Sequence, residues 1–316
     1  MRLPCRSVLL AVALAATSAA GAQPRAAGAA ASPARVTVLY DAFGSRSSAM
    51  TKDWGYAALV EYGGARILFD TGNDAAIFAR NVHAAGVDLR TLDFVVVSHR
   101  HGDHTSGLNH LLRVNPRVKI YAPREAYGVF GGSLPESFYR RADSLPREER
   151  YFEGEPPPSI RHGTPWPGAA FVFVDSLTTV APGVTLVPTV SDVAGTRELR
   201  ELSLSIRTPD GQVLVVGCSH AGIERVVAAA VPVDSAVRLI VGGLHLASAP
   251  DSVVERTALA LRDRWHVQGV APGHCTGEPG FAIFRRTFGP GFVYAGLGTR
   301  IPIAGAAGSG APARPG

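Results

Sequence analysis

The strongest constraint on the fold is a short apolar run that leads directly into a cluster of histidines. Residues 94–97 are all apolar and are typical of a strand that is buried on both faces. The residues that follow are Ser98, His99, Arg100, His101, Gly102, Asp103 and His104. Three imidazoles and a carboxylate so close together are costly to bury unless a cation binds them. The run therefore predicts a metal site at the end of a buried strand.

The spacing within this cluster predicts two neighbouring cation positions. His99 and His101 are two residues apart, so an extended strand end points both rings the same way. Asp103 and His104 then lie on the following turn and can face a second position. This suits two metal ions, one on nitrogen ligands and the other on mixed oxygen and nitrogen ligands. A solvated polar loop with chance histidines is the alternative, and it explains the spacing poorly.

Short β-rich runs and helical patterns alternate along most of the chain, and together they predict one α+β domain. The expected strands are residues 36–40, 56–62, 66–70, 94–97, 118–121, 171–174, 184–187, 202–207, 212–217, 238–241 and 269–271. Helices are expected after Asp74, which can cap the first of them, and at residues 108–112, 222–230 and 252–264. Strands in pairs, with helices between and after them, predict two sheets packed face to face under outer helices, a four-layer αββα sandwich.

The ends of the chain differ in composition from the domain between them. Residues 1–22 have the features of a secretory signal peptide, with two arginines before a short apolar run and small residues at the cleavage position. An Ala-rich disordered start is the alternative. Residues 23–34 are expected to be a flexible lead-in, residues 35–303 the domain, and residues 304–316 a disordered tail. The apolar run is too short for a stable membrane anchor, so a periplasmic or secreted protein is predicted.

The regular pattern breaks down between residues 128 and 167. Prolines and glycines interrupt any period there, and charged residues gather near residues 140–155. We interpret residues 128–167 as a surface insertion, a kind of segment that often forms lids or substrate loops. Arg140, Arg141 and Arg147 are candidates to bind a phosphate, although arginines in a polar loop are usually only solvated.

Composition narrows the class of protein. Hydrophobic residues make up 46% of the 316 residues, which excludes a disordered chain, and three cysteines are too few for a disulfide framework. The net charge of +5 is spread along the chain and does not itself identify a partner, but no basic run marks a nucleic-acid arm, so no nucleic acid is expected. The expected partner is a small-molecule substrate. After export, Cys218 and Cys275 would meet an oxidising compartment and must be metal-bound, buried or paired with each other. The sequence does not indicate an oligomeric state.

The histidine cluster resembles the H-x-H-x-D-H signature of the metallo-β-lactamase superfamily, and the resemblance extends over about residues 36–303. An upstream strand that ends in LFDTG, residues 68–72, matches the family's first motif. The resemblance implies that Asp70 orders the metal loop through hydrogen bonds. Three later segments are similar to the branch that includes the dihydropterin ribofuranosylaminobenzene-phosphate synthases, many of whose members are known only as metal-dependent hydrolases. These segments are residues 217–223, 242–246 and 272–277.

The resemblance implies further ligands in the last third of the chain. His274 matches the family's last metal ligand. His220 is expected to take over the role of a histidine that the family usually carries upstream of residue 217. Cys218 stands where most members have a metal-bridging aspartate, and it either binds a soft ion such as zinc or is simply a buried thiol.

Two further residues lie in the segments 217–223 and 242–246. His245 is either a group that contacts the ligands or the substrate, or an ordinary strand-end histidine. Ser219 is not expected to be an acyl nucleophile, because Ala221 replaces the second glycine of the nucleophile elbow. Asp103 and His245 are the expected catalytic groups. The expected metal ligands are His99, His101, Asp103, His104, Cys218, His220 and His274.

Together these residues predict an exported metal-dependent hydrolase. Two divalent ions would lower the pKa of a bound water to about 7. Zinc is the expected metal, and manganese and iron are the alternatives. The bridging hydroxide would attack a carbonyl or phosphoryl centre of an ester-type substrate, with Asp103 orienting it and shuttling a proton. Two alternatives stay open: a transferase similar to the pterin-pathway synthases, and a non-catalytic metal-binding protein on the same fold.

Overall fold

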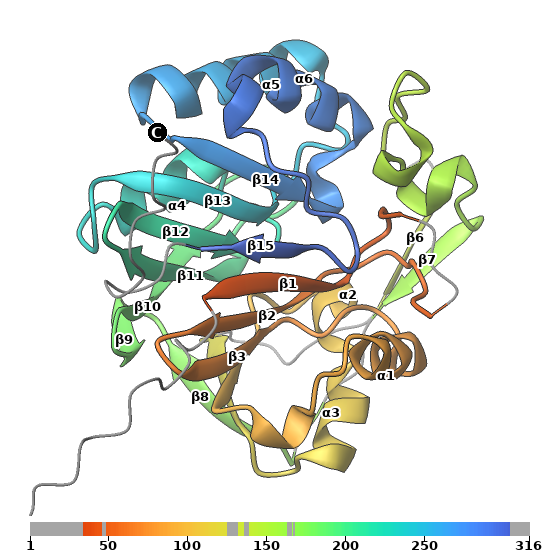
Figure 1. Cartoon of the computed structure of the whole chain (residues 1–316), viewed down its shortest axis with the longest axis vertical. Helices are drawn as coiled ribbons and strands as arrows, with labels where there is room; N and C mark the ends of the chain where they lie inside the picture. The colour runs from red at the N-terminus through yellow and green to blue at the C-terminus, as the bar shows by residue number, and fades with distance from the viewer. Residues whose placement is uncertain are drawn as a thin grey trace, which may run out of the picture. The chain divides into compact units, whose positions relative to one another are not determined.

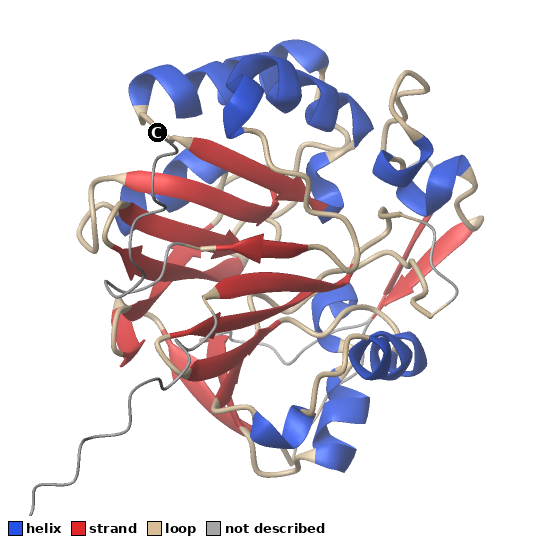
Figure 2. Cartoon of the chain, in the orientation of Figure 1, coloured by secondary structure: helices blue, strands red, loops and turns tan. Residues whose placement is uncertain are grey.

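Two mixed β-sheets, with helices on their outer faces, form the part of the chain that the structure describes (Figure 1, Figure 2). The computed structural model describes residues 34–45, 49–124, 132–135, 139–162, 166 and 168–303. The expected signal segment, the lead-in up to residue 33 and the expected tail lie outside the described residues. The α+β sandwich predicted from the sequence is confirmed.

The first sheet has seven strands in the order β15-β1-β2-β3-β4-β5-β8. Their bounds are β1 Arg35–Tyr40, β2 Ala57–Tyr62, β3 Ala65–Phe69, β4 Phe94–Val96, β5 Lys119–Pro123, β8 Ala170–Val174 and β15 Arg300–Pro302. Strands β15, β1, β2 and β3 pair antiparallel, whereas β3, β4, β5 and β8 are parallel. Parallel strands end at the same edge of a sheet, so the segments that follow β3 and β4 lie together.

The second sheet has six strands in the order β14-β13-β12-β11-β10-β9. Their bounds are β9 Thr178–Ala181, β10 Val184–Val190, β11 Arg200–Thr208, β12 Gly211–Val216, β13 Val237–Gly243 and β14 Gly269–Gly273. Strands β9 to β12 are antiparallel, and β12, β13 and β14 are parallel. The carboxyl ends of these last three strands therefore share one edge as well.

Helices cover both outer faces of the pair of sheets. Figure 1 shows α1 and α3 outside the first sheet, and α5 and α6 outside the second. The bounds are α1 Ala75–Ala84, α2 Gly102–Thr105, α3 Leu108–Val114, α4 Ile223–Ala230, α5 Asp251–Leu259 and α6 Glu278–Phe288. Helix α5 continues into a π-helical turn at Ala260–Arg264. Asp74 caps α1 as predicted, because its side chain accepts hydrogen bonds from the first backbone N–H groups of the helix.

Alternate side chains of the central strands pack on opposite faces and hold the layers together. In β3, Ile67 and Phe69 join the core between the sheets, whereas Leu68 joins the core under α1 and α3. In β12, Val215 joins the core between the sheets, and Leu214 joins the core under α4, α5 and α6. Burying one such side chain contributes about 1.5–3 kcal/mol, so this alternation fixes which face of each sheet packs against the other sheet and which face the helices cover.

Part of the segment predicted to be a surface insertion is structured and buried. Strands β6 (Gly132–Pro135) and β7 (Ser159–His162) pair antiparallel. Tyr139 and Tyr151 are buried in one cluster with Trp54, and Tyr139 stacks on the indole with 5.1 Å between ring centroids. The prediction of a purely surface segment is therefore wrong for these aromatic side chains. Prolines and glycines hide any period here, so tertiary contacts define the segment, among them the packing against Trp54 and the backbone hydrogen bonds of Ala142 and Tyr151 to Glu278.

Candidate metal centre

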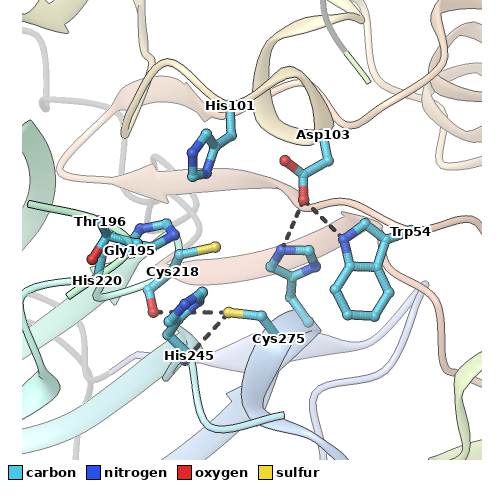
Figure 3. Close-up of a pocket in the computed structure, with 10 residues that line it drawn as sticks. Trp54, His101, Asp103, Gly195, Thr196, Cys218, His220, His245 and Cys275 are labelled. Carbon is cyan, nitrogen blue, oxygen red and sulfur yellow. Dashed lines mark hydrogen bonds and ion pairs between the residues drawn. The ribbon is translucent and has the colours of Figure 1, made fainter. Parts of the chain in front are cut away.

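The candidate site lies where the carboxyl ends of parallel strands from both sheets meet (Figure 3). The structure brings the sequence-predicted site residues together at this edge. They are Asp70 after β3, the loop of residues 98–104 after β4, Cys218 and His220 after β12, His245 after β13 and His274 after β14. A cavity of about 190 Å³ opens among them, and Trp54 and Cys275 also line it.

The first cluster of donors consists of His99, His101, His220 and Cys218. His99 Nε2 and His101 Nδ1 lie 3.0 Å apart, and the His220 ring centroid is 4.8 Å from each of their rings. One donor atom each of His99, Cys218 and His220 lies within 4.8 Å of the other two. Burial and the neighbouring imidazoles hold the pKa of His99 and of His220 well below the usual value, so both rings are neutral. A neutral imidazole offers the lone pair that a metal ion binds.

The second cluster consists of His104, His274, Asp103 and Cys218. His104 Nε2 lies 3.1 Å from His274 Nε2 and 3.2 Å from the Cys218 sulfur. Asp103 Oδ2 lies 3.3 Å from His274 Nε2. Cys218 is thus common to both clusters and occupies the place between them. The Cys218 sulfur is therefore within reach of an ion in either cluster, and its two predicted roles, metal ligand or buried thiol, both stay predictions.

Opposite charges dominate the second cluster. Burial alone lowers the pKa of His104, but the carboxylates of Asp103 and Asp70 outweigh it and raise the pKa to about 9. Burial alone raises the pKa of Asp103, yet the charges of His104 and His274 bring it well below the usual value. The second cluster therefore holds a proton between carboxylates at neutral pH when no ion is bound. A cation at the same place would serve the same electrostatic role.

Asp70 holds the metal loop through three short hydrogen bonds. Its Oδ1 accepts from the backbone N–H of Ser98 at 2.7 Å, and its Oδ2 accepts from the Ser98 hydroxyl and from His104 Nδ1, each at 2.7 Å. The bond to Nδ1 leaves His104 Nε2 directed at His274. Gly217 lies against this network, and a Cβ there would come within 2.2 Å of the Ser98 hydroxyl.

Glu201, on β11, is a site residue that the sequence did not reveal. Its Oε1 binds His220 Nδ1 at 2.9 Å, and its Oε2 accepts from the His220 backbone N–H at 2.5 Å. Oε1 also lies 3.8 Å from His99 Nδ1. Glu201 therefore fixes the direction of the His220 ring, as Asp70 does for His104. The only sequence signal is an acidic residue beside an apolar strand, which is too common to identify a site.

Two further side chains at the edge of the second cluster also escaped prediction. Trp54 Nε1–H donates to Asp103 Oδ2 at 3.0 Å, and its ring lies 5.0 Å from the His274 ring. Asp41 is fully buried and accepts from the backbone N–H of His274 at 3.0 Å. This hydrogen bond helps to hold His274 in a left-handed backbone conformation, with φ 47°, that non-glycine residues seldom adopt.

A second thiol and His245 lie on the other side of Cys218. Cys275 is buried, and its sulfur accepts from the backbone N–H of His245 at 3.3 Å. Burial raises the pKa of Cys275, but the hydrogen bond from Cys218 and the charges of His274 and His245 outweigh it and bring the pKa well below the usual value. The His245 ring packs against the His220 ring, with 4.1 Å between centroids. His245 therefore lies in the wall of the site.

The remaining candidates from the sequence do not join the two clusters. Ser219 donates its hydroxyl to the Gly243 carbonyl at 3.0 Å, in agreement with the prediction that it is no nucleophile. Arg140 is bound to Asp251 and to the Ala249 carbonyl, and Arg147 forms an ion pair with Glu155. These contacts tie both arginines to the protein itself and give no support to a phosphate site.

Comparison with known proteins now adds to the geometry. A family model described as the metallo-beta-lactamase superfamily matches residues 54–252, which are 199 of the 316 residues. The chain belongs to the metallo-β-lactamase superfamily. The resemblance of the H-x-H-x-D-H run to this superfamily is thereby confirmed. Members of the superfamily are largely enzymes and typically bind metal ions, and the histidine and cysteine clusters of this chain are in keeping with that.

Individual relatives are moderately similar to this chain in sequence. The 7,8-dihydropterin-6-methyl-4-(beta-D-ribofuranosyl)-aminobenzene-5'-phosphate synthase of Methanocaldococcus jannaschii is 25% identical over 247 residues, 71% of this chain and 79% of the relative. The anti-Pycsar protein Apyc1 of Bacillus phage 010DV004 is 31% identical over 128 residues, 40% of this chain and 47% of the relative. The solved structure of Tm1679, a metal-dependent hydrolase of the beta-lactamase superfamily, has a TM-score of 0.63 at 24% identity and covers 85% of this chain and 99% of its own.

Proposed function

We propose that this chain is a hydrolase that uses two divalent metal ions to cleave an ester-type bond at a carbonyl or phosphoryl centre of a small molecule. One observation carries the proposal. The first and second clusters, which the chain assembles from both sheets, share Cys218 between them. Two donor sets around one shared atom support two ions side by side, next to the cavity of about 190 Å³.

The chemistry of the donors fits such ions. His104 Nε2 and His274 Nε2 face each other at 3.1 Å, and His99 Nε2 faces His101 Nδ1 at 3.0 Å. Facing lone pairs repel unless a proton or a cation lies between them. Imidazole, carboxylate and thiolate together suit zinc and are also accepted by iron, whereas manganese prefers oxygen ligands. We favour zinc because Cys218 is the shared donor.

The residues of the site have distinct tasks in this proposal. The bound ions would lower the pKa of water and stabilise the negative charge that develops on the substrate. Trp54 and His274 hold Asp103 as a carboxylate, which can bind a cation and orient the attacking group. Asp70 and Glu201 keep the lone pairs of His104 and His220 directed at the ions.

A transferase is the second candidate, and a specific observation favours it. The synthase of Methanocaldococcus jannaschii that is 25% identical to this chain carries a name that implies group transfer, not hydrolysis. A site of this kind can serve either reaction, because the ions polarise the same type of bond and only the attacking group differs. Hydrolysis remains the preferred proposal because it needs no second substrate: the attacking group would be a water bound by the two ions.

Metal removal and substrate profiling test these alternatives. Purified protein is stripped with a chelator, reloaded with zinc, manganese or iron, and assayed on lactones, β-lactams, thioesters and phosphodiesters. We expect hydrolysis only after reloading, abolished in His274→Ala and retained in His83→Ala, because His83 is exposed on α1. Full hydrolytic activity in metal-free protein would refute the proposed role of the metal ions. If metal-loaded protein hydrolyses none of these substrates but turns them over once an alcohol or amine acceptor is added, the transferase is favoured. If it shows no turnover in either case, a non-catalytic metal-binding protein is favoured.

Export to the periplasm or the medium is part of the proposal. It rests on residues 1–22 of the sequence, and the two remaining thiols would then be protected by burial or by metal binding. Within the described residues, no helix has the length and apolar character needed to cross a membrane. N-terminal sequencing of the protein from fractionated cells of a bacterial host tests export: we expect the chain to begin at Gln23, and a cytosolic chain that keeps residues 1–22 would contradict it.

A further inference from the structure

Two strong metal donors of this pocket belong to neither the first nor the second cluster. They are the sulfur of Cys275 and the imidazole of His245, both in the cavity wall (Figure 3). One donor atom each of Cys218, His245 and Cys275 lies within 4.8 Å of the other two. Cys218 thus takes part in three donor groups, and the proposed hydrolysis uses only two of them.

We propose that Cys218, His245 and Cys275 form a third position, selective for a thiophilic cation such as zinc. The proposal rests on the proposed function, since it shares the pocket and Cys218 with the two ions of the hydrolase. Two sulfurs and one imidazole are a ligand set known from zinc enzymes, in which the fourth place stays open. The same set disfavours manganese and magnesium, which prefer oxygen. In this proposal His245 binds a cation and does not transfer a proton.

The backbone holds these donors in place without the help of an ion. The carbonyl of Cys275 accepts hydrogen bonds from the backbone N–H groups of Leu246 and Ala247, at 2.9 and 3.0 Å. The Cys275 sulfur accepts from the backbone N–H of His245 at 3.3 Å. The turns that carry the two side chains are therefore tied to each other, and His245 is held at a left-handed φ of 52°. Such preorganisation reduces the entropy lost when a ligand binds.

Space for the second sulfur depends on a glycine. A Cβ on Gly243 would come within 2.8 Å of the Cys275 sulfur and within 2.3 Å of the Gly217 carbonyl oxygen. Any side chain at residue 243 would therefore displace the sulfur from Cys218 and His245. The glycine keeps the two thiols and the imidazole within reach of one ion.

A thiol that serves only as a small apolar side chain is the simplest alternative. Cys275 does pack near Phe281 and Ala247, which agrees with that view. Against it, the Nδ1 atom of His245 is buried and has no hydrogen-bond partner among the described residues. A buried polar atom without a partner costs about 1–3 kcal/mol, and a cation or its ligand would remove this cost.

The test counts metal ions in the whole protein. Wild-type, Cys275→Ala and His245→Asn proteins are loaded with excess zinc, desalted and analysed for metal and protein content. Asparagine is chosen because it tolerates the left-handed backbone at this position, and His83→Asn, on the exposed face of α1, is the matched control. We expect three zinc ions per chain in the wild type and in the control, and two in the other variants. With manganese we expect two in every protein.

Cobalt gives a second measurement that needs no variant. During titration of metal-free wild-type protein, the third equivalent should increase the thiolate-to-cobalt charge-transfer absorption, because Cys275 then enters the coordination sphere. Saturation at two equivalents, equal zinc counts in all four proteins, or a Cys218–Cys275 disulfide in the isolated protein would overturn the third position. Three bound zinc ions without hydrolysis would instead overturn the proposed function and leave the third position standing.

Discussion

Replacing Asp70 by asparagine tests how the metal loop is held. Asparagine has nearly the same size and, like aspartate, tolerates the left-handed φ of 57° at this position. Asp70 Oδ1 accepts from the backbone N–H of Ser98, so the amide oxygen of the variant must take that place. The amide NH2 then replaces Oδ2 and faces the Ser98 hydroxyl and His104 Nδ1.

The substitution therefore removes the hydrogen-bond acceptor of His104 Nδ1. An amide NH2 cannot accept the proton of Nδ1, so the ring either loses this hydrogen bond or moves the proton to Nε2. Nε2 is the atom that lies 3.1 Å from His274 Nε2, and a proton there blocks the lone pair that an ion needs. A hydrogen bond to a charged group contributes about 1.5–3 kcal/mol. Loss of a partner that orients a metal-binding histidine weakens binding about 10- to 100-fold, or about 1.4–2.7 kcal/mol, and the two ranges agree.

Competition with a chromophoric zinc chelator measures this change directly. We expect the ion of the second cluster to bind about 10- to 100-fold more weakly in Asp70→Asn. Asp175→Asn is the control, because Asp175 is exposed and forms an ion pair with Arg124 on the surface. Thermal unfolding of the metal-free proteins shows whether both variants fold. Wild-type zinc affinity in a folded Asp70→Asn protein would refute the role given to Asp70.

Three further predictions follow from the same contacts. In Glu201→Gln, His220 loses its charged partner, so we expect about 10- to 100-fold weaker binding of the first-cluster ion alone in metal-content measurements; equal loss of both ions would contradict this. In Trp54→Phe, Asp103 loses an N–H donor, so steady-state kinetics should show about tenfold lower kcat with KM retained, and an unchanged kcat would speak against it. In metal-free protein, the folded-state pKa of His104, about 9, exceeds its unfolded value of 6.5, so the stability it contributes is complete below pH 6.5 and lost as the pH rises through 9. The unfolding temperature should fall across that window without zinc but not with zinc, and identical profiles would exclude the idea.

Local signals were sufficient wherever the chemistry is contained in a few neighbouring residues. The apolar run before Ser98 and the histidine spacing predicted β4 and the metal loop, because burial on both faces and a turn at the strand end are local properties. Asp74 predicted the start of α1 in the same way, since a cap acts within one helical turn. The donors His220 and His274 were placed by resemblance to family motifs, and the structure brings both to the loop.

Features that depend on distant pairing were missed. Glu201 reaches His220 only because β11 pairs between β10 and β12, a register that no nearby residue specifies. Strand β15 has three residues and exists through its pairing with β1, far away in the chain. Helix α6 begins with a proline and a glycine in its first turn, which in the sequence resemble a loop. Tertiary context decides all three, so propensity and period could not reveal them.

The division of donors between the sheets links metal binding to the packing of the fold. The loop of residues 98–104 extends from the first sheet and contributes to both clusters, whereas Cys218, His220 and His274 come from the second sheet. Neither sheet completes a cluster by itself, so an ion bound in either cluster joins the two sheets. Its binding free energy then adds to the stability of their packing, because the unfolded chain does not preserve the site. Metal binding and the docking of the sheets are therefore coupled, so a variant that binds the ions more weakly gains less stability from added metal, even where its metal-free fold is unchanged.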